Sequence, residues 1–463
     1  MENSFLTSFL MISSPLSLTF LAVLILLFVL MYFLKKQKVS FSIRTIIGTV
    51  IGIILGIAIQ LIGKTPENPM DITWIKETTK WYSLFGNGFI DLIRMIVIPL
   101  IVVSIIYVII SIKNSSNMKQ LTSKTVIAYV VNVFIACIIG IIIANLFNLG
   151  SSSTLSNSSY EIKEIKSFVD IIRNLIPKNP VDSMVNTNVI AIVIFSAFVG
   201  IAAKKMSSIY KTQIDSFVKL IEALHKIIIS IAMSIINLVP YAVIPLMTNS
   251  IAQRGMKSAL DVITFIIALY VAVAIMFVVH LIALYLFGYN PLTYLKKAVA
   301  PLFLAFTSRS SVGTLPVAVE TLTNSMGITD STAAFVMGLG TTAGQAGCAG
   351  IFGAMVVMNT ANMSGMALTF SFYLMTIIVV TVSSFGIAGI PGGGHTVASS
   401  VLSGTGLTSS FEYVGPILAV DPILDMGRTL LNINGALTVS LIVDKSLKQV
   451  NMETFNNKDI KLS

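Results

Sequence analysis

The chain has 463 residues, of which 55% are hydrophobic and 11% are charged, and its formal net charge at pH 7 is +10. Soluble domains usually carry about 25% charged residues, so this composition excludes an ordinary soluble globular protein. Apolar runs of roughly 20 residues, the length that crosses about 30 Å of hydrocarbon, occur at 15–34, 43–63, 84–112, 125–148, 187–203, 226–247, 259–287, 351–381 and 414–443. The sequence therefore predicts an all-α polytopic membrane protein.

The first apolar run, 15–34, is too long for a signal peptide, a lysine cluster follows it, and no small-residue cleavage site is present. We expect a retained N-terminal transmembrane helix within residues 1–38. The basic residues lie in short segments between the runs, which fits the positive-inside rule better than a nucleic-acid surface. The loop at 149–159 lacks them. The predicted topology places the N-terminus outside and the tail, 449–463, in the cytoplasm.

The first half of the chain reads as conventional long helices, in which Pro99, Pro240 and Pro245 are expected to produce kinks. The second half is interrupted by stretches rich in Ser, Gly and Pro, at 307–316, 338–355 and 382–400. Irregular backbone at membrane depth is tolerated only where it is buried in protein or lines a wet cavity. Two interrupted units in succession indicate an inverted repeat around a binding site. We expect re-entrant hairpins near 298–325 and 365–408.

Five polar residues lie at offsets 0, 4, 7, 8 and 11 along the last apolar run and so form one helical stripe: Asp421, Asp425, Arg428, Thr429 and Asn432. Each ionised group at the bilayer centre costs about 2.5–3.5 kcal/mol. An ion pair that only joins two helices is one interpretation, but apolar residues would usually serve as well. Intramembrane charges are by default functional.

The stripe suits a zwitterionic solute, whose ammonium group needs an anion such as Asp425 and whose carboxylate needs Arg428 or neutral donors. Asn432 can serve either end. Ser310 and Ser311, at the first interrupted stretch, would suit a carboxylate if they lie at the N-terminus of a half-helix. The two cysteines, Cys137 and Cys348, form no disulfide framework or metal motif. We predict no cofactor, no metal and no nucleic-acid partner.

The interrupted stretches and the charged helix carry three motifs, "SRSSVGTLP" (308–316), "GIAGIPGGG" (386–394) and "DMGRTLLNINGALT" (425–438). With these motifs the chain resembles the dicarboxylate/amino acid:cation symporters, the glutamate-transporter-like family, over about residues 43–448. The resemblance implies a homotrimer in the lipid membrane with an elevator mechanism. Scaffold helices would occupy 39–118 and 151–256, and a moving transport domain 119–150 and 257–448.

The resemblance also assigns roles to residues. The amino-group ligand would be Asp425, the side-chain carboxylate ligand Arg428, and the α-carboxylate contacts Ser311 and Asn432. Ser310 and Thr429 would complete this group. The extracellular gate would be the tip at 384–394, which contributes Gly389, Pro391 and Gly392.

The chain departs from the family pattern where sodium is bound. The family's Asn-Met-Asp-Gly-Thr motif is replaced by residues 344–348, "GQAGC", a later aspartate by Ala436, and a Thr-Ser pair by Asn132 and Val133. A sodium site built from backbone carbonyls, of Thr342, Ser384, Phe385 and Ile387, could survive these changes. Alternatively the coupling cation is a proton on Asp421 or Asp425, because burial disfavours a charged carboxylate. His395 is either a proton relay or a packing or solvated residue.

The pattern of departures is most similar to the L-cystine uptake branch of the family in bacteria, which implies the bacterial cell membrane. The three consecutive glycines at 392–394 would leave room for a long solute. A proton- or sodium-coupled carrier of acidic amino acids or C4-dicarboxylates is the alternative, since Arg428 permits both. An enzyme is disfavoured because no nucleophile, base or metal grouping is present in the sequence. A channel is disfavoured because channels usually carry rings or repeated pore motifs.

Overall fold

The computed structural model describes residues 9–66, 68–111, 116–151, 178–185, 189–254, 256–386 and 393–457. These residues form helices joined by turns and contain no strand. Within them, seven helices are long and apolar enough to cross a membrane, or eight if one bent pair counts as a single span. The prediction of an all-α polytopic membrane protein is confirmed.

A first group of helices packs mainly within itself, through contacts of α3 with α10 and of α4 with α8, α9 and α10. The α9–α10 pair bends by 52°. Pro240 lies in the first turn of α10 after this bend, whereas Pro99 lies within the continuous α4. The group comprises α2 (Pro15–Lys36), α3 (Phe41–Ile62), the short η2 (Pro69–Asp71), α4 (Thr73–Ser111), α7 (Pro180–Val185), α8 (Val189–Met206), α9 (Lys211–Ile236) and α10 (Val239–Arg254).

The N-terminal helix α2 is anchored to the start of α4 by polar contacts. Ser14 caps α2 by accepting a hydrogen bond from Leu16 N, and Glu77 accepts bonds from Ser13 N and Ser17 Oγ. Tyr82 OH donates to the carbonyl of Phe20. The outer face of α2 is apolar and exposed. The helix therefore packs as an integral part of the first group.

A second group surrounds the charged helix α19 (Asp421–Ser446), which contacts α5, α11, α12, α13 and α14. Protein buries 83% of the apolar window of α19, against 39% for α11. A helix that carries charges must be shielded from hydrocarbon, and the other members of the group provide this shield. They are α5 (Ser116–Leu146), α11 (Met256–Leu286), α12 (Pro291–Ser308), α13 (Ser311–Glu320), η4 (Thr321–Ser325), α14 (Asp330–Gly340), η5 (Ala346–Phe352) and α15 (Gly353–Met363).

The helical path breaks where the sequence is rich in Ser, Gly and Pro. Helices α12 and α13 are joined at Arg309, which adopts a left-handed conformation with φ 55°, and Ser310 caps α13 by accepting a bond from Gly313 N. Residues 341–345 separate α14 from η5. The remaining short helices are α16 (Phe370–Ser383), η6 (Ser384–Gly386), α17 (Gly394–Gly404), η7 (Thr408–Val414) and α18 (Gly415–Ala419).

Three apolar runs do not correspond to single helices. The run 351–381 is divided between α15 and α16 by residues 364–369, where Gly365 has a positive φ of 67°. The run 414–443 is divided at Val420, between α18 and α19, and the run 226–247 spans the α9–α10 bend. Hydropathy alone does not report these breaks, because apolar residues flank each of them.

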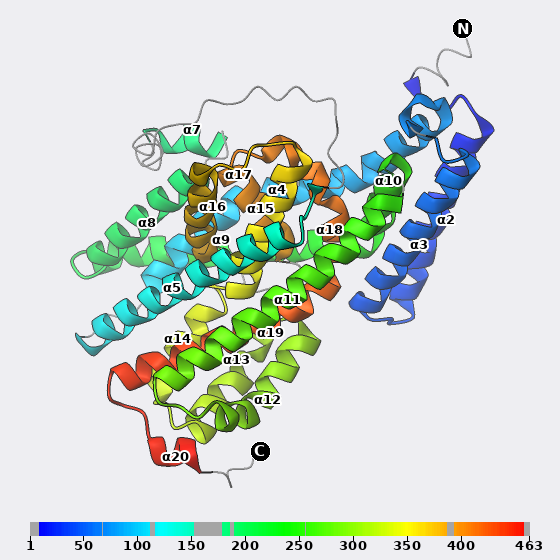
Figure 1. The fold of residues 1–463 in the computed structure, drawn as a ribbon. Helices are drawn as coiled ribbons and strands as arrows, with labels where there is room; N and C mark the ends of the chain where they lie inside the picture. Colours follow the sequence, from blue (N-terminus) through cyan, green and yellow to red (C-terminus); the bar gives the residue numbers. More distant parts are fainter. Residues whose placement is uncertain are drawn as a thin grey trace.

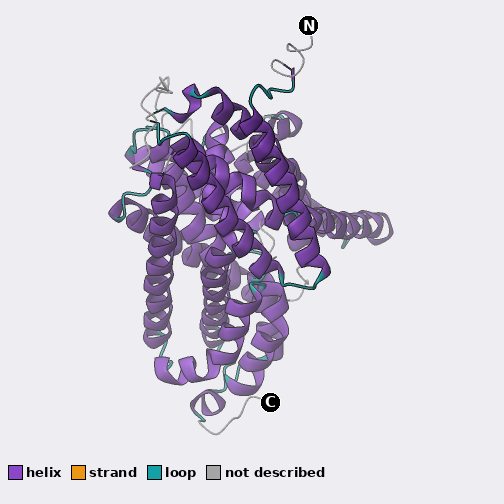
Figure 2. Ribbon diagram, turned by 90° about the vertical axis from the view of Figure 1, so that its right-hand side faces the viewer, coloured by secondary structure: helices purple, strands orange, loops and turns teal. Residues whose placement is uncertain are grey.

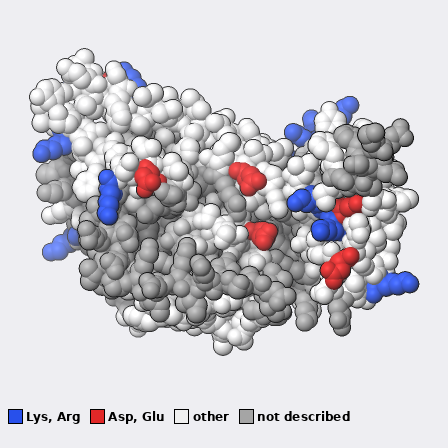
Figure 3. Space-filling model, turned by 90° about the horizontal axis from the view of Figure 1, so that it is seen from above, with Lys and Arg blue, Asp and Glu red and all other residues white. Residues whose placement is uncertain are grey.

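Helix α2 and the short C-terminal helix α20 (Met452–Asn456) lie at opposite ends of the molecule (Figure 1). The side view shows a bundle of helices that run roughly parallel, with part of the helical structure projecting to one side (Figure 2). Seen from above, basic and acidic side chains are scattered over the described surface in small groups (Figure 3). Charge therefore does not define a continuous surface on this face of the described chain.

Candidate functional site

A buried ion-pair cluster lies at the start of α19. The Arg428 Nη2 atom donates to Asp421 Oδ1 at 2.6 Å and to Asp425 Oδ1 at 3.0 Å. All three residues are at most 2% exposed. Helical spacing places them on one stripe, as predicted, and Asp421 in the first turn also benefits from the positive end of the helix dipole. The two carboxylates thus share one guanidinium in a low-dielectric environment.

The Arg428 guanidinium has binding capacity left over. Its Cζ atom lies 4.2 Å from the centroid of the Phe352 ring, which supports the cation from one face. Its Nε and Nη1 atoms are buried and have no hydrogen-bond partner among the described residues. Unpaired buried donors on a charged group are costly, so this side of Arg428 is suited to receive an acceptor such as a carboxylate.

Gly394, the first residue of α17, closes one side of the cluster. A Cβ atom built at this position would overlap Asp421 Oδ1 and Arg428 Nη1. Glycine therefore leaves room for the close approach of α17 to the ion pair, and a larger residue would displace the side chains of Asp421 and Arg428. Gly389, Pro391 and Gly392, the predicted contacts from the same tip, lie outside the described residues.

His395 follows Gly394 and is 1% exposed, so the interpretation as a solvated histidine is wrong. Its ring packs edge-on against Phe89 of α4, with centroids 5.4 Å apart. Its Nδ1 atom lies 3.9 Å from Asp421 Oδ2, longer than a hydrogen bond. His395 therefore lies between the charged cluster and the first helix group.

Asn432 and Thr429, the other residues of the stripe, bond inside the protein. The Asn432 Oδ1 atom accepts from Gly347 N at 2.8 Å and from Cys348 N at 3.2 Å, and Nδ2 donates to Cys348 Sγ at 3.0 Å. Thr429 Oγ1 donates to Asp425 Oδ1 at 3.4 Å. Asn432 thus satisfies the backbone of η5, which the break after α14 would otherwise leave unpaired.

Ser310 and Ser311 lie at the N-terminus of α13, which packs against α19. The Ser310 hydroxyl is engaged in capping α13, and Ser311 is buried. Between α12 and Ser310, Arg309 is buried and interacts electrostatically with Asp425. Sequence reasoning missed Arg309, Phe352 and Gly394 as neighbours of the cluster, although Arg309 and Gly394 stand in the quoted motifs.

A sequence profile of the sodium:dicarboxylate symporter family matches residues 41–446. The chain belongs to this family. The L-cystine uptake protein TcyP of Bacillus cereus (strain ATCC 10987 / NRS 248) is 35% identical over 456 residues, which cover 95% of this chain and 97% of that protein. The protein of the same name from Bacillus subtilis (strain 168) is 34% identical over 451 residues, covering 94% and 96%. This member of the sodium:dicarboxylate symporter family is a multi-pass membrane transporter and not an enzyme.

Membership of the sodium:dicarboxylate symporter family implies a coupling cation, and the structure shows how the candidate residues for it lie. Gly344 N donates to the carbonyl of Ser384 at 3.1 Å, so the break after α14 meets the end of α16. Thr342 lies in this break, Phe385 follows Ser384 in η6, and Ile387 lies outside the described residues. The carbonyl-bearing segments are therefore neighbours. Among the described residues, no cluster of three or more His, Cys, Asp or Glu could hold a metal ion.

Asn132, one of the positions where the chain departs from the family pattern, belongs to a buried polar network. His280 Nε2 lies 2.8 Å from Asn132 Oδ1, and His280 Nδ1 lies 2.8 Å from Asn434 Nδ2. Tyr294 OH donates to Asn434 Oδ1 at 2.7 Å. Since Nδ1 accepts from an amide, Nε2 carries the proton and the imidazole is neutral. His280 of α11 thus links Asn132 of α5 to Asn434 of α19.

Proposed function

We propose that this protein imports L-cystine across the bacterial cell membrane by cation-coupled symport. The observation that carries the proposal is the buried cluster of Asp421, Asp425 and Arg428, with two guanidinium nitrogens left without a described partner. The names of the two Bacillus relatives support cystine as the solute. The predicted roles of Asp425 toward the ammonium group and Arg428 toward a carboxylate fit these charges.

Binding would require the cluster to rearrange. Arg428 now engages both carboxylates, so an incoming ammonium group would replace it at Asp425, while the solute carboxylate would meet Nε and Nη1. After this exchange each buried charge still has a partner of opposite sign, which keeps the cost of burial low. Cystine carries two such zwitterionic ends, and Ser311, Thr429 and Asn432 would contact the solute after local changes.

We assign the first helix group to the scaffold, and the second group together with α16, η6, α17, η7 and α18 to the moving transport domain of an elevator, within a homotrimer. The preference of each group for contacts within itself supports this division. The proposed topology places the N-terminus outside the cell and the C-terminus in the cytoplasm. The α12–α13 and α16–α17 pairs would be the two re-entrant hairpins.

The coupling cation would be a proton or a sodium ion. Two carboxylates and one guanidinium carry one net negative charge when all are ionised, which favours cation uptake, and Arg309 offsets part of this charge. The break after α14 and the end of α16 are joined by the bond between Gly344 and Ser384. Backbone carbonyls of these two segments would be the ligands of a sodium ion. Uptake into proteoliposomes, driven separately by a sodium gradient and by a pH gradient, distinguishes the two ions.

Competition for uptake of radiolabelled L-cystine tests the solute. We expect unlabelled L-cystine to block uptake and succinate, which lacks an ammonium group, to leave it unchanged. Strong inhibition by succinate, glutamate and aspartate would instead favour the acidic amino acid or dicarboxylate carrier.

Counterflow exchange distinguishes a carrier from a channel. A carrier is expected to show saturable uptake with counterflow exchange, whereas a flux without exchange would contradict the proposed carrier and indicate a channel.

A further inference from the structure

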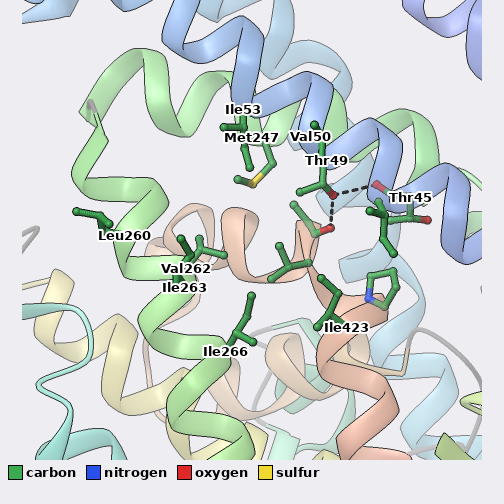
Figure 4. Close-up of a pocket in the computed structure, with 14 residues that line it drawn as sticks. Thr45, Thr49, Val50, Ile53, Met247, Leu260, Val262, Ile263, Ile266 and Ile423 are labelled. Carbon is green, nitrogen blue, oxygen red and sulfur yellow. Dashed lines mark hydrogen bonds between the residues drawn. The ribbon is translucent and has the colours of Figure 1, made fainter. Parts of the chain in front are cut away.

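An apolar cavity of about 400 Å³ lies between the two helix groups, away from the polar faces of the charged cluster. One wall is formed by α3 and α10, including Val50 and Met247, and the opposite wall by α11 with the residues on either side of Asp421 (Figure 4). The cavity therefore adjoins both the first group and the backbone that carries the site. Neither the family membership nor the proposed transport accounts for it.

The cavity offers no free hydrogen-bond donor to an occupant. Of its lining residues only Thr45 and Thr49 carry polar side chains. Thr45 Oγ1 donates to the Phe41 carbonyl, and Thr49 Oγ1 contacts the carbonyls of Thr45 and Ala419 at 2.9 and 3.0 Å (Figure 4). The protons of both hydroxyls are thus used within the protein. Water, which needs two to four polar partners, is not stabilised in such a space.

The mouth of the cavity opens on the outer surface of the spanning helices. Four of its lining residues are 43–59% exposed, namely Ile46 and Val50 on α3 and Leu260 and Ile263 on α11. Both helices belong to the apolar spans, and their outward faces are hydrophobic. In a multi-pass membrane protein these faces meet lipid, so the medium at the mouth is hydrocarbon.

We propose that this cavity is a binding site for an acyl chain of a membrane phospholipid. A lipid chain gains no hydrophobic free energy by leaving the bilayer, but it restores the dispersion contacts that an empty cavity loses. The volume lies within the usual range of small-ligand sites, about 300–1,000 Å³. The walls of the cavity belong to both helix groups. A bound acyl chain would therefore set how far apart, and in what alignment, the two groups lie next to Asp421.

Fluorescence quenching by brominated acyl chains tests the site. In a background with Trp74→Phe and Trp81→Phe, the reporter is Met247→Trp, and the matched control is Met276→Trp. Both methionines are 1% exposed, but only Met247 lines the cavity. In detergent-free liposomes of brominated phosphatidylcholine, we expect at least threefold stronger quenching at position 247 than at 276. Equal quenching at the two positions overturns the proposal.

A second reporter guards against misfolding of the first. Ile53 lines the same cavity from α3, so Ile53→Trp is the second reporter. Its quenching should fall by at least half when Val262→Phe fills the cavity from the opposite wall. Quenching that persists unchanged in the filled variant also overturns the site. These readouts do not depend on transport. A slower cystine uptake by Val262→Phe is expected in addition, and that expectation alone rests on the proposed function.

Discussion

Arg428 is the residue on which the candidate site depends. It lies between two carboxylates and above Phe352, and it is fully buried. A buried charge that loses its partner is strongly destabilised, whereas a shared charge can change partners at lower cost. The presence of a second aspartate thus gives the cluster an alternative pairing when a solute enters.

Neutralising Asp425 or shortening the reach of Arg428 should abolish cystine uptake. Removing one member of a buried charge pair costs about 2–5 kcal/mol, so Asp425→Asn and Arg428→Lys should each reduce uptake at least about 30-fold. Asp444→Asn is the control, because Asp444 is buried on the same helix but bonds to Thr329 near its other end. The measurement is uptake per transporter inserted in liposomes. Near-normal uptake by either variant would count against a solute site here.

Gly394 tests the geometry of the same cluster without changing a charge. Gly394→Ala would place a Cβ atom against Asp421 and Arg428, so we expect at least a tenfold loss of uptake with insertion retained. Gly338→Ala is the control, since its Cβ would meet no atom within 4 Å. The two variants are compared by uptake and by thermal stability in detergent. Unchanged uptake by Gly394→Ala would show that α17 does not need this close approach.

At the scale of elements, the C-terminal helix α20 is fastened to the α12–η4 unit. Lys297 is buried and its Nζ donates to the carbonyls of Ser325, Thr454 and Phe455 at 2.6, 2.9 and 2.8 Å. Asn451 N also donates to the carbonyl of Gly327, whose φ is 71°. The ammonium group uses its three donors on backbone carbonyls, so among the described residues α20 is held through backbone carbonyls.

Lys297→Met should release α20. A hydrogen bond from a charged group contributes about 1.5–3 kcal/mol, so amide exchange in residues 451–457 should accelerate at least about tenfold. Lys296→Met is the neighbouring control, because Lys296 is exposed. Hydrogen exchange followed by mass spectrometry measures both variants. Equal protection of α20 in the two variants would mean that Lys297 does not hold the helix.

At the scale of the whole molecule, the elevator proposal requires the two helix groups to move past each other. Thr49 of α3 and Ala419 of α18 are joined by a hydrogen bond across the boundary. In the double variant Thr49→Cys/Ala419→Cys, a short bifunctional thiol reagent should stop uptake, and reduction should restore it. The pair Ser83→Cys/Asn249→Cys, within the first group, is the control. Full uptake by the cross-linked boundary pair would contradict relative motion.

The sequence by itself determined the membrane class, the polar stripe of α19 and the chain breaks within the Ser-, Gly- and Pro-rich stretches. These features are local, because a helix repeats every 3.6 residues and Gly-, Ser- and Pro-rich stretches interrupt it wherever they occur. The family was also evident from motifs that are contiguous in the chain. The relative placement of Asp421, Asp425 and Arg428 followed from the same helical spacing.

Only the tertiary structure decided which groups meet across elements. It brought Phe352 beneath Arg428 and Gly394 against the ion pair, bonded Asn432 to the backbone of η5, and buried His395. It also divided the apolar run at 351–381 into two helices. The bond of Asn432 to Gly347 joins residues 85 positions apart, and His395 packs against Phe89, which lies 306 positions earlier in the chain. No periodicity encodes such contacts, because they result from side chains of several helices filling one interior.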